Sequence, residues 1–440
     1  MLFHHVEPII TQHLPPNHQG STLLLALSGG LDSRVMLDLL ARYQQLHPDV
    51  HCRAVHIHHG LSANADAWAN QCQQWCDGYG IALTVLRVTV DPSNGGVEQA
   101  ARQARYSALA LEMDAKTVLL TAQHRDDQCE TVLLALKRGS GPKGLSAMPV
   151  VAPFAQGSHL RPLLKNVTRR ELELYATEQH LSWVEDESNQ DSRYERNFLR
   201  HDVVPLLTQR WPDFSAAVSR SAQLCAEQEQ LLDLLLADKL EAAMDERGTL
   251  NCEPLCAQPR LMQRQLLRRW LQYHRIQMPT QRQLEQILQD VILAKSDANP
   301  AFQLTGVQLR RFKQRLELVP LVADLSAWQS PLHLEQPLSL PEGVGELLLN
   351  KEKQGSLCLR MPEDNEVITV RFAVSGLKVQ PVGRTAGRRK LKKLYQEMAV
   401  PSWQRTRLPM IFYGDQLAAI AGLFVCEGFQ GQALTLHWRA

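Results

Sequence analysis

The chain has 440 residues, 44% hydrophobic and 21% charged, which suits about three globular domains and excludes wholesale disorder. Its 47 basic and 46 acidic residues leave a formal net charge of +1, which alone does not suggest a nucleic-acid partner. Nine cysteines without a C-x-x-C pair exclude a disulfide scaffold, argue against a zinc ribbon or iron–sulfur motif, and indicate reduced thiols in a cytoplasmic protein. The sequence begins without a signal-peptide pattern and contains no run of roughly 20 apolar residues, so we expect no membrane association.

The first half of the chain alternates short apolar runs with segments of helical spacing. We predict strands at 21–27, near 52–58, at 81–90 and at 117–123, and helices beginning near residues 31, 65, 97 and 126. Strands and helices in this order predict the α/β class, with an open, mostly parallel sheet flanked by helices. Ligands bind such sheets beyond the carboxyl ends of the strands, where segments 28–33, 56–60 and 123–127 lie.

The composition changes after about residue 210. A long helix at 214–240 is predicted to connect domains, and a proline-punctuated stretch at 331–341 resembles a linker. The sequence at 367–372 predicts a strand in a small α+β domain. We expect an organisation in four parts: a catalytic domain at 1–212, a connecting helix at 213–245, a helical domain at 246–325 and the α+β domain at 340–440.

A glycine-containing loop follows the first predicted strand. Its members are Ser28, Gly29, Gly30, Leu31, Asp32 and Ser33. The glycines allow a tight turn whose backbone N–H groups face phosphate oxygens, and the helix start adds partial positive charge. Asp32 beside phosphates requires a cation between them, for which Mg²⁺ is the simplest choice. The Gly-Lys-Ser/Thr ending of kinase-like loops is absent. The simpler alternative is a turn in which Asp32 caps the helix.

The loop resembles that of the ATP-pyrophosphatase superfamily, and the remaining motifs resemble one branch of it, the tRNA(Ile)-lysidine synthetases. The matching residues are His59-Gly60, Glu98, Ala101-Arg102, Arg105-Tyr106, Asp126–Thr131, Arg138–Gly141, Gly144-Leu145, Arg161–Leu163, Glu185–Asn189, Arg196-Asn197, Gly387–Lys393 and Pro409–Gly414. One position differs: where many members have two histidines before the aspartates, this chain has Gln123-His124.

This resemblance implies a ligase that uses ATP and Mg²⁺. It would adenylate the wobble cytidine of the isoleucine tRNA with a CAU anticodon and join free L-lysine to C2, releasing AMP and pyrophosphate. Codon reading would change from AUG to AUA, and tRNA identity from Met to Ile. Adenylation is needed because the 2-oxo oxygen of cytosine cannot leave as oxide. Residues 28–33 would hold ATP through its pyrophosphate portion, with Asp32 on Mg²⁺.

Three carboxylates begin the fourth predicted helix of the sheet domain. Asp126 and Glu130 share a face, while Asp127 points about 100° away. Acidic residues often complement a helix start, but we expect Asp127 to help hold Mg²⁺ and either Asp126 or Glu130 to pair with the lysine ammonium group. The attacking amine needs a general base, for which His124 and Glu130 are both candidates. His59 is predicted either to approach ATP or to be structural.

Candidate tRNA-binding cations occur in three places. Arg102 and Arg105 lie on one predicted helix, and Arg196 has Arg193 and Arg200 at helical spacing, these two expected on a solvated face. Segment 384–407 has eight basic residues and one acid, a local charge of +7. Its predicted contacts are Arg388, Arg389, Lys390, Lys392 and Lys393.

Two other functions use the same features. A tRNA thiolase of this superfamily would adenylate a base before adding sulfur, but those related to 2-thiocytidine synthesis generally carry C-x-x-C pairs. A non-catalytic tRNA-binding protein would not need the full set of glycines, carboxylates and arginines. A monomer and a homodimer both stay open.

Overall fold

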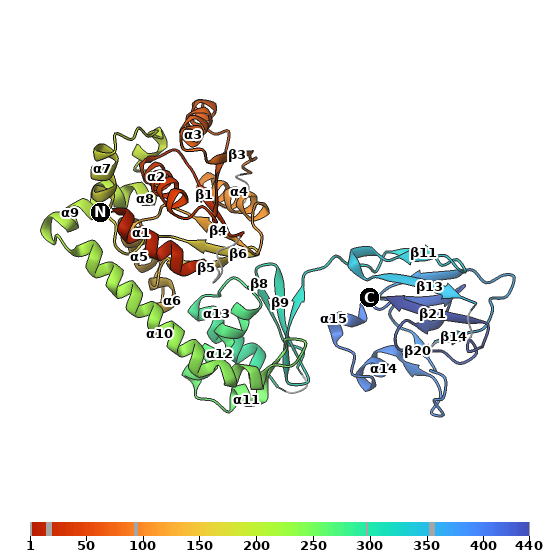
Figure 1. The fold of residues 1–440 in the computed structure, drawn as a ribbon. Helices are drawn as coiled ribbons and strands as arrows, with labels where there is room; N and C mark the ends of the chain where they lie inside the picture. Colours follow the sequence, from red (N-terminus) through yellow and green to blue (C-terminus); the bar gives the residue numbers. More distant parts are fainter. Residues whose placement is uncertain (1, 15–19, 92–95, 296–297, 352–356, 440) are drawn as a thin grey trace. The chain divides into compact units, whose positions relative to one another are not determined.

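The computed structural model describes residues 2–14, 20–91, 96–295, 298–351 and 357–439 (Figure 1). The chain divides into two compact units, Met1–Leu234 and Leu235–Ala440. The division falls inside the long helix α10, Phe214–Ala243, which was predicted at 214–240. The four-part organisation expected from the sequence stays a prediction.

The first unit is built on an α/β sheet whose strands run in the order β3-β2-β1-β4-β6-β5. Every neighbouring pair is parallel except β5 and β6, which pair antiparallel at one edge. This confirms the predicted open, mostly parallel sheet. The strands are β1 Thr22–Ala26, β2 His51–His58, β3 Ala82–Arg87, β4 Thr117–Leu120, β5 Val151–Phe154 and β6 Gly157–Leu160.

Helices cover both faces of this sheet, because the strands are apolar on both sides (Figure 1). Leu23 and Leu25 of β1 pack into one core cluster, while Leu24 between them packs into the cluster on the opposite face. The helices are α1 Leu2–His13, α2 Leu31–Leu46, α3 Ala65–Tyr79, α4 Val97–Leu111, α5 Arg125–Lys137, α6 Pro142–Leu145, α7 Arg169–Glu178, α8 Glu195–Phe198 and α9 Val204–Arg210.

The second unit begins with helices α11 Cys252–Cys256, α12 Arg260–Tyr273 and α13 Gln281–Gln286. The same region, predicted as helical, also contains an antiparallel sheet in the order β7-β10-β9-β8. Its strands are β7 Leu250–Asn251, β8 Ala301–Leu304, β9 Val307–Phe312 and β10 Arg315–Pro320. The β9–β10 turn was missed because Lys313 and Gln314, not glycine, adopt positive φ values of 46° and 63° there.

The rest of the second unit is mainly antiparallel, with sheet orders β11-β15-β18-β19-β20 and β12-β13-β21-β14. Its strands and helices are β11 Gln329–Pro331, β12 Leu338–Ser339, β13 Glu346–Asn350, β14 Cys358–Leu359, β15 Ile368–Arg371, β16 Lys378–Val379, β17 Arg389–Lys390, α14 Leu391–Glu397, α15 Ser402–Arg405, β18 Met410–Tyr413, β19 Gln416–Ile420, β20 Phe424–Val425 and β21 Leu434–Arg439.

The stretch at 331–341 is not the linker that the sequence suggested. Its prolines flank strand β12, and Leu332 and Leu340 are buried in the core cluster of the second unit. The strand predicted at 367–372 corresponds to β15. None of the helices in the described ranges combines the length and apolar character that a membrane crossing requires.

Candidate active site

The phosphate-type loop joins β1 to α2 in a tight turn. Gly29 has a φ of 92°, which a side chain would oppose, and a Cβ there would lie 3.3 Å from the Cys72 sulfur. Ser33 Oγ accepts a hydrogen bond from the Gly29 N–H at 3.1 Å and donates to the Gly30 carbonyl at 3.0 Å. Gly30 is the N-cap of α2, with no side-chain cap among the described residues. The alternative in which Asp32 caps this helix is therefore wrong, and the first N–H groups of α2 are available to an anion.

His124 caps helix α5 and connects the loop to that helix. The ring Nδ1 of His124 accepts a hydrogen bond from the backbone N–H of Asp126 at 3.3 Å. The backbone N–H of His124 donates to Asp127 Oδ2 at 3.0 Å. Because Nδ1 is an acceptor, a neutral ring carries its proton on Nε2. That atom is buried and lies 3.7 Å from Asp32 Oδ2 and 3.5 Å from Asp127 Oδ2. Asp32 and Asp127, the two aspartates predicted to bind metal, therefore both lie close to the His124 ring.

Two arginines from a distant segment neutralise the carboxylates of α5. Arg196 Nε donates to Glu130 Oε2 at 3.0 Å, and Arg200 Nε donates to Glu130 Oε1 at 2.7 Å. Arg200 also donates to Asp127 Oδ1 at 2.8 Å. Glu130 has a side-chain exposure of only 2%, so the arginine pair makes its ionised form tolerable in the interior. Both Glu130 oxygens are therefore occupied by arginine donors.

The solvent exposure predicted for Arg193 and Arg200 on a helix face is correct for Arg193 and wrong for Arg200. Arg193 precedes α8, pairs with Asp191 at 2.7 Å and has a side-chain exposure of 89%. Arg200 instead points into the carboxylate cluster, with an exposure of 23%. Helical spacing alone could not separate these two arginines, because the difference lies in which carboxylates the fold brings to each.

Arg169 is a site residue that the sequence did not reveal. Its backbone N–H donates to Asp126 Oδ2 at 2.9 Å, and its guanidinium NH1 lies 3.7 Å from Asp32 Oδ2. It is the first residue of α7, which begins with a capping box between Thr168 and Glu171. That Thr-x-x-Glu pattern marks a helix start in the sequence, but nothing local shows that this start lies against Asp126 and Asp32.

The two aspartates at His124 have opposite pKa shifts. Burial raises the pKa of Asp32, as does the charge of Asp127, and these outweigh the opposing effects of His124, Arg169 and Arg200. Burial would also raise the pKa of Asp127, but His124, Arg200 and Arg196 together hold that pKa below its usual value. Asp127 is thus a stabilised anion, whereas Asp32 carries a charge that the surroundings disfavour.

The chemistry of these carboxylates fits Mg²⁺. Asp32 Oδ1 is buried and has no hydrogen-bond partner in the described ranges, so this oxygen is available to a cation. The described residues include no cluster of three or more His, Cys, Asp or Glu side chains able to hold a metal alone. Mg²⁺ characteristically takes one or two carboxylates and completes its coordination with water and substrate phosphates. Asp32 and Asp127 match that pattern.

His59 and the α4 arginines lie along the same carboxyl edge of the sheet. Burial lowers the pKa of His59, and the charge of Arg105 lowers it further. His59 Nδ1 is buried without a hydrogen-bond partner among the described residues. Arg102 lies over the Tyr106 ring at 5.0 Å. The side chain of Glu98 is outside the described residues, so its part in the motif is not placed.

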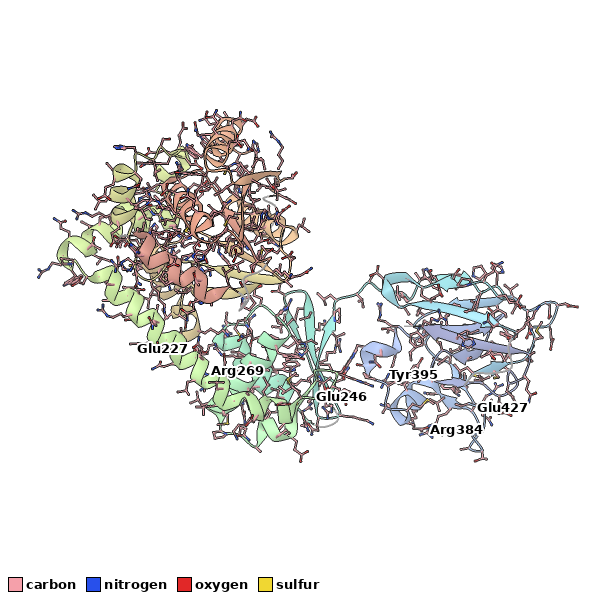
Figure 2. All side chains as sticks on the ribbon, in the orientation of Figure 1. Glu227, Glu246, Arg269, Arg384, Tyr395 and Glu427 are labelled. Carbon is pink, nitrogen blue, oxygen red and sulfur yellow. The ribbon has the colours of Figure 1, made fainter. Side chains whose placement is uncertain are left out.

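The basic segment of the second unit is partly neutralised within itself. Glu397 accepts a hydrogen bond from Arg384 and forms an ion pair with Arg389, each at 2.7 Å (Figure 2 labels Arg384 and Tyr395). Burial raises the pKa of Tyr395 to about 12, in agreement with core packing. Within segment 384–407, the exposed cations that form no ion pair with a described residue are Arg388, Lys390, Lys392 and Lys393.

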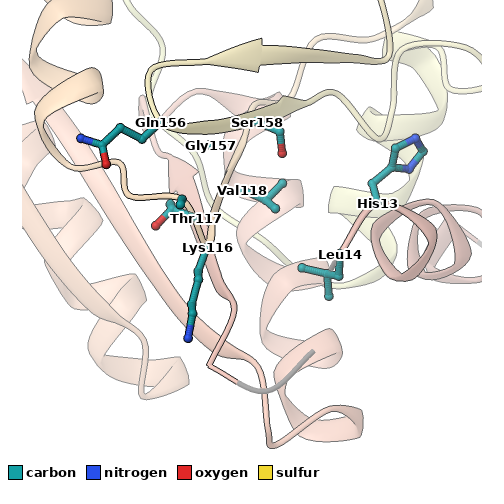
Figure 3. Close-up of a pocket in the computed structure, with 9 residues that line it drawn as sticks. His13, Leu14, Lys116, Thr117, Val118, Gln156, Gly157 and Ser158 are labelled. Carbon is teal, nitrogen blue, oxygen red and sulfur yellow. The ribbon is translucent and has the colours of Figure 1, made fainter. Parts of the chain in front are cut away.

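A separate pocket of about 350 Å³ lies at the opposite end of the strands (Figure 3). Thr117 and Val118 at the start of β4, Gly157 and Ser158 at the start of β6, and His13 at the end of α1 line it. Because the phosphate-type loop follows the carboxyl end of β1, this pocket belongs to the other edge of the sheet and not to the carboxylate cluster.

Comparisons with known proteins identify the family of this chain. Residues 3–207 match the PP-loop domain family, residues 250–317 the TilS substrate binding domain family and residues 368–440 the TilS substrate C-terminal domain family. The chain is 49% identical over 439 residues to the tRNA(Ile)-lysidine synthase of Photobacterium profundum, covering 100% of this chain and 99% of that protein.

Two further relatives carry the same name. The tRNA(Ile)-lysidine synthase of Serratia proteamaculans is 50% identical over 421 residues, covering 95% of each chain. That of Vibrio cholerae is 50% identical over 418 residues, covering 94% of each chain. With a PP-loop sheet, a carboxylate–arginine cluster at its carboxyl edge and similarity along the whole chain, this protein belongs to the tRNA(Ile)-lysidine synthase family.

Proposed function

We propose that this chain adenylates the wobble cytidine of the isoleucine tRNA with a CAU anticodon and then joins free L-lysine to C2. The observation that carries this proposal is the meeting of Asp32 from the PP-loop and Asp127 from α5 at His124 Nε2, at 3.7 and 3.5 Å. It occurs in a chain about half identical, end to end, to tRNA(Ile)-lysidine synthases. The product would be lysidine, which reads AUA in place of AUG.

The first step is adenylation. The cytosine 2-oxo oxygen attacks the α-phosphorus of ATP, an O–P bond forms, and the bond to the β-phosphate breaks to release pyrophosphate. The turn at Gly29 and the uncapped N–H groups of α2 would stabilise the negative charge that develops on pyrophosphate. Mg²⁺ held by Asp32 and Asp127 would neutralise charge between these carboxylates and the phosphates. Arg169, beside Asp32, adds a cation on the same side.

The second step is displacement by lysine. The amine nitrogen attacks C2, the C2–O bond breaks, AMP leaves, and the nitrogen loses a proton. Of the two acids expected to pair with the ammonium group, Asp126 is better supported, because Arg196 and Arg200 already occupy Glu130. The proton acceptor stays a prediction between His124 and Glu130. His124 has Nδ1 engaged in the cap of α5, and Glu130 has both oxygens bonded to arginine.

Contacts with tRNA are proposed at two places. The exposed cations Arg388, Lys390, Lys392 and Lys393 suit phosphate contacts away from the target base. Arg102 and Arg105 suit the RNA near the catalytic edge, whereas Arg196 has its guanidinium engaged by Glu130 and Thr131. Free lysine, ATP and tRNA meet in the cytoplasm, where we expect the reaction.

A direct test mixes the protein with ATP, Mg²⁺ and bulk tRNA and asks which amino acid stimulates release of AMP and pyrophosphate. Lysine alone should do so and should become covalently bound to RNA. Stimulation by sulfide would support a thiolase instead. Formation of ADP and phosphate, or tRNA binding without ATP cleavage, would contradict the proposed reaction.

A further inference from the structure

Four polar side chains form a continuous hydrogen-bonded row at the carboxyl ends of β4 and β6. Arg161 NH2 bonds to His159 Nδ1 at 3.0 Å, and His159 Nε2 bonds to Thr121 Oγ1 at 2.7 Å. Thr121 Oγ1 in turn donates to Gln123 Oε1. The sequence motifs drew attention to Arg161 and to Gln123, and none of these four side chains is used in the proposed steps above.

The row has one direction, which the donor and acceptor properties of its members determine. Arginine can only donate, so His159 Nδ1 accepts and Nε2 carries the ring proton. That N–H donates to Thr121 Oγ1, which leaves the Thr121 hydroxyl proton for the next neighbour. The neighbour must therefore be the amide oxygen of Gln123, since its NH₂ group could not accept this proton.

The row is held rigidly from its buried end. His159 is 3% and Arg161 8% exposed, and Arg161 NH1 also donates to the Pro149 carbonyl at 2.9 Å. Burial, with the charges of Arg161 and Arg102, lowers the pKa of His159 to about 3, so the ring stays neutral at physiological pH. The Tyr106 and Phe154 rings each lie 6.0 Å from the His159 ring, which limits its rotation.

The free end of the row is the NH₂ group of Gln123. This side chain is half-buried, directly precedes His124 and follows the carboxyl end of β4. Its Nε2 has no hydrogen-bond partner within the described ranges of the chain, while its Oε1 is held by Thr121. The amide therefore presents a fixed pair of donors at the edge where the carboxylate cluster lies.

We propose that Gln123 Nε2 donates a hydrogen bond to an acceptor atom of the target nucleotide in the RNA substrate, and that Thr121, His159 and Arg161 are positioning residues for it. This inference rests on the proposed function. RNA suits this donor better than ATP for two reasons. The uncapped N–H groups at the start of α2 already suit the ATP phosphates. Arg102 of α4, a proposed RNA contact, lies close enough to His159 to act on its charge together with Arg161. A neutral hydrogen-bond donor with a fixed direction can select a base whose edge carries an acceptor at the right place. Electrostatic attraction to the phosphates cannot distinguish one base from another.

The test compares Gln123 variants in steady-state kinetics and in tRNA binding without turnover. Gln123→Glu keeps the oxygen that Thr121 bonds but loses the donor, and should raise the tRNA KM and Kd by about tenfold or more. The KM values for ATP and lysine should stay within about twofold. Gln123→His keeps one acceptor and one donor nitrogen and should stay within about threefold of the unmodified chain for tRNA.

The positioning role has its own matched pair. Thr121→Ser keeps the hydroxyl and should preserve the tRNA KM, whereas Thr121→Val breaks the row and should raise that KM severalfold without changing the KM for ATP. An unchanged tRNA KM in Gln123→Glu, or a rise confined to the KM for ATP, would overturn the inference. Failure of the unmodified chain to release AMP in response to lysine would instead contradict the proposed function. The tRNA-binding measurement is independent of that failure.

Discussion

Arg200 donates a 2.8 Å hydrogen bond to Asp127 although the two residues are 73 positions apart. The same guanidinium also bonds to Glu130, so one cation from the segment after α8 serves two carboxylates of α5. The arrangement keeps Asp127 ionised, because Arg200 and His124 oppose the effect of its burial on the pKa. An ionised Asp127 beside Asp32 is what a Mg²⁺ site on this edge requires.

Replacing the PP-loop carboxylate should separate chemistry from RNA binding. Asp32→Asn removes the anion proposed to hold Mg²⁺ but leaves the basic segment of the second unit unchanged. We expect release of AMP and pyrophosphate to fall below detection, while the tRNA Kd stays within about twofold. Asp49→Asn, at an exposed position just before β2, is the matched control and should keep full activity. Equal loss of catalysis and tRNA binding in Asp32→Asn would indicate a structural role.

The same substitution should stabilise the fold at neutral pH. The pKa of Asp32 is raised in the folded state, so its ionised form costs stability at every pH above that pKa. Asn removes this cost, and the melting temperature of Asp32→Asn should exceed that of the unmodified chain at pH 7. The difference should shrink as the pH falls through the folded-state pKa of Asp32, where the native carboxyl takes up a proton. Thermal melts at several pH values test this, and a lower melting temperature at pH 7 would contradict it.

Replacing Asp127 should change the melting temperature in the opposite direction. Its folded-state pKa is lowered, so its charge contributes stability above the unfolded pKa, and that contribution is lost as the pH falls through the folded value. Asp127→Asn should therefore lower the melting temperature at pH 7, with the deficit decreasing in acid. Comparison with Asp32→Asn over the same pH series gives an internal control, since the two curves should deviate in opposite directions.

The largely buried Arg200 should contribute more to stability and activity than the exposed Arg193. Arg200→Gln leaves Asp127 with one partner fewer and Glu130 with Arg196 alone, so a buried charge becomes undercompensated. We expect a loss of about 3 kcal/mol in the stability of the first unit, together with loss of activity. Arg193→Gln breaks an ion pair whose arginine is 89% exposed, and should change stability little. Urea denaturation followed in the first unit measures both, and equal effects would contradict the assignment.

The exposed cations of the C-terminal segment should control the salt dependence of tRNA binding. Changing Lys390, Lys392 and Lys393 to Gln should weaken binding and reduce the slope of log K against log salt by about 1 per lost phosphate contact. The KM for lysine should not change. A matched triple at the exposed Lys165, Lys239 and Lys351 should leave the slope unaltered. An unaltered slope in the first triple would show that these residues do not contact phosphate.

Much of the fold of the first unit could be predicted from the sequence, because its signals are local. Apolar runs of strand length, helical spacing and the glycines of residues 28–30 indicated β1, the loop and α2 in the right order. The second unit was harder to predict. The β9–β10 turn lacks glycine, and the prolines of 331–341 occur beside strand β12 and the buried Leu332 and Leu340, where a linker was expected.

The sequence by itself determined that Asp32 follows a phosphate-type turn and that Asp126, Asp127 and Glu130 begin a helix, because near neighbours set turns and helix starts. Only the tertiary structure decided what these carboxylates face. Arg169 lies 43 positions from Asp126, and Arg196 lies 66 from Glu130, distances over which no residue pattern specifies a contact. The direction of Gln123 was decided in the same way, since it depends on His159 of the neighbouring strand. Charge state and hydrogen-bond direction are properties of the neighbours in space, and packing of the sheet supplies those neighbours.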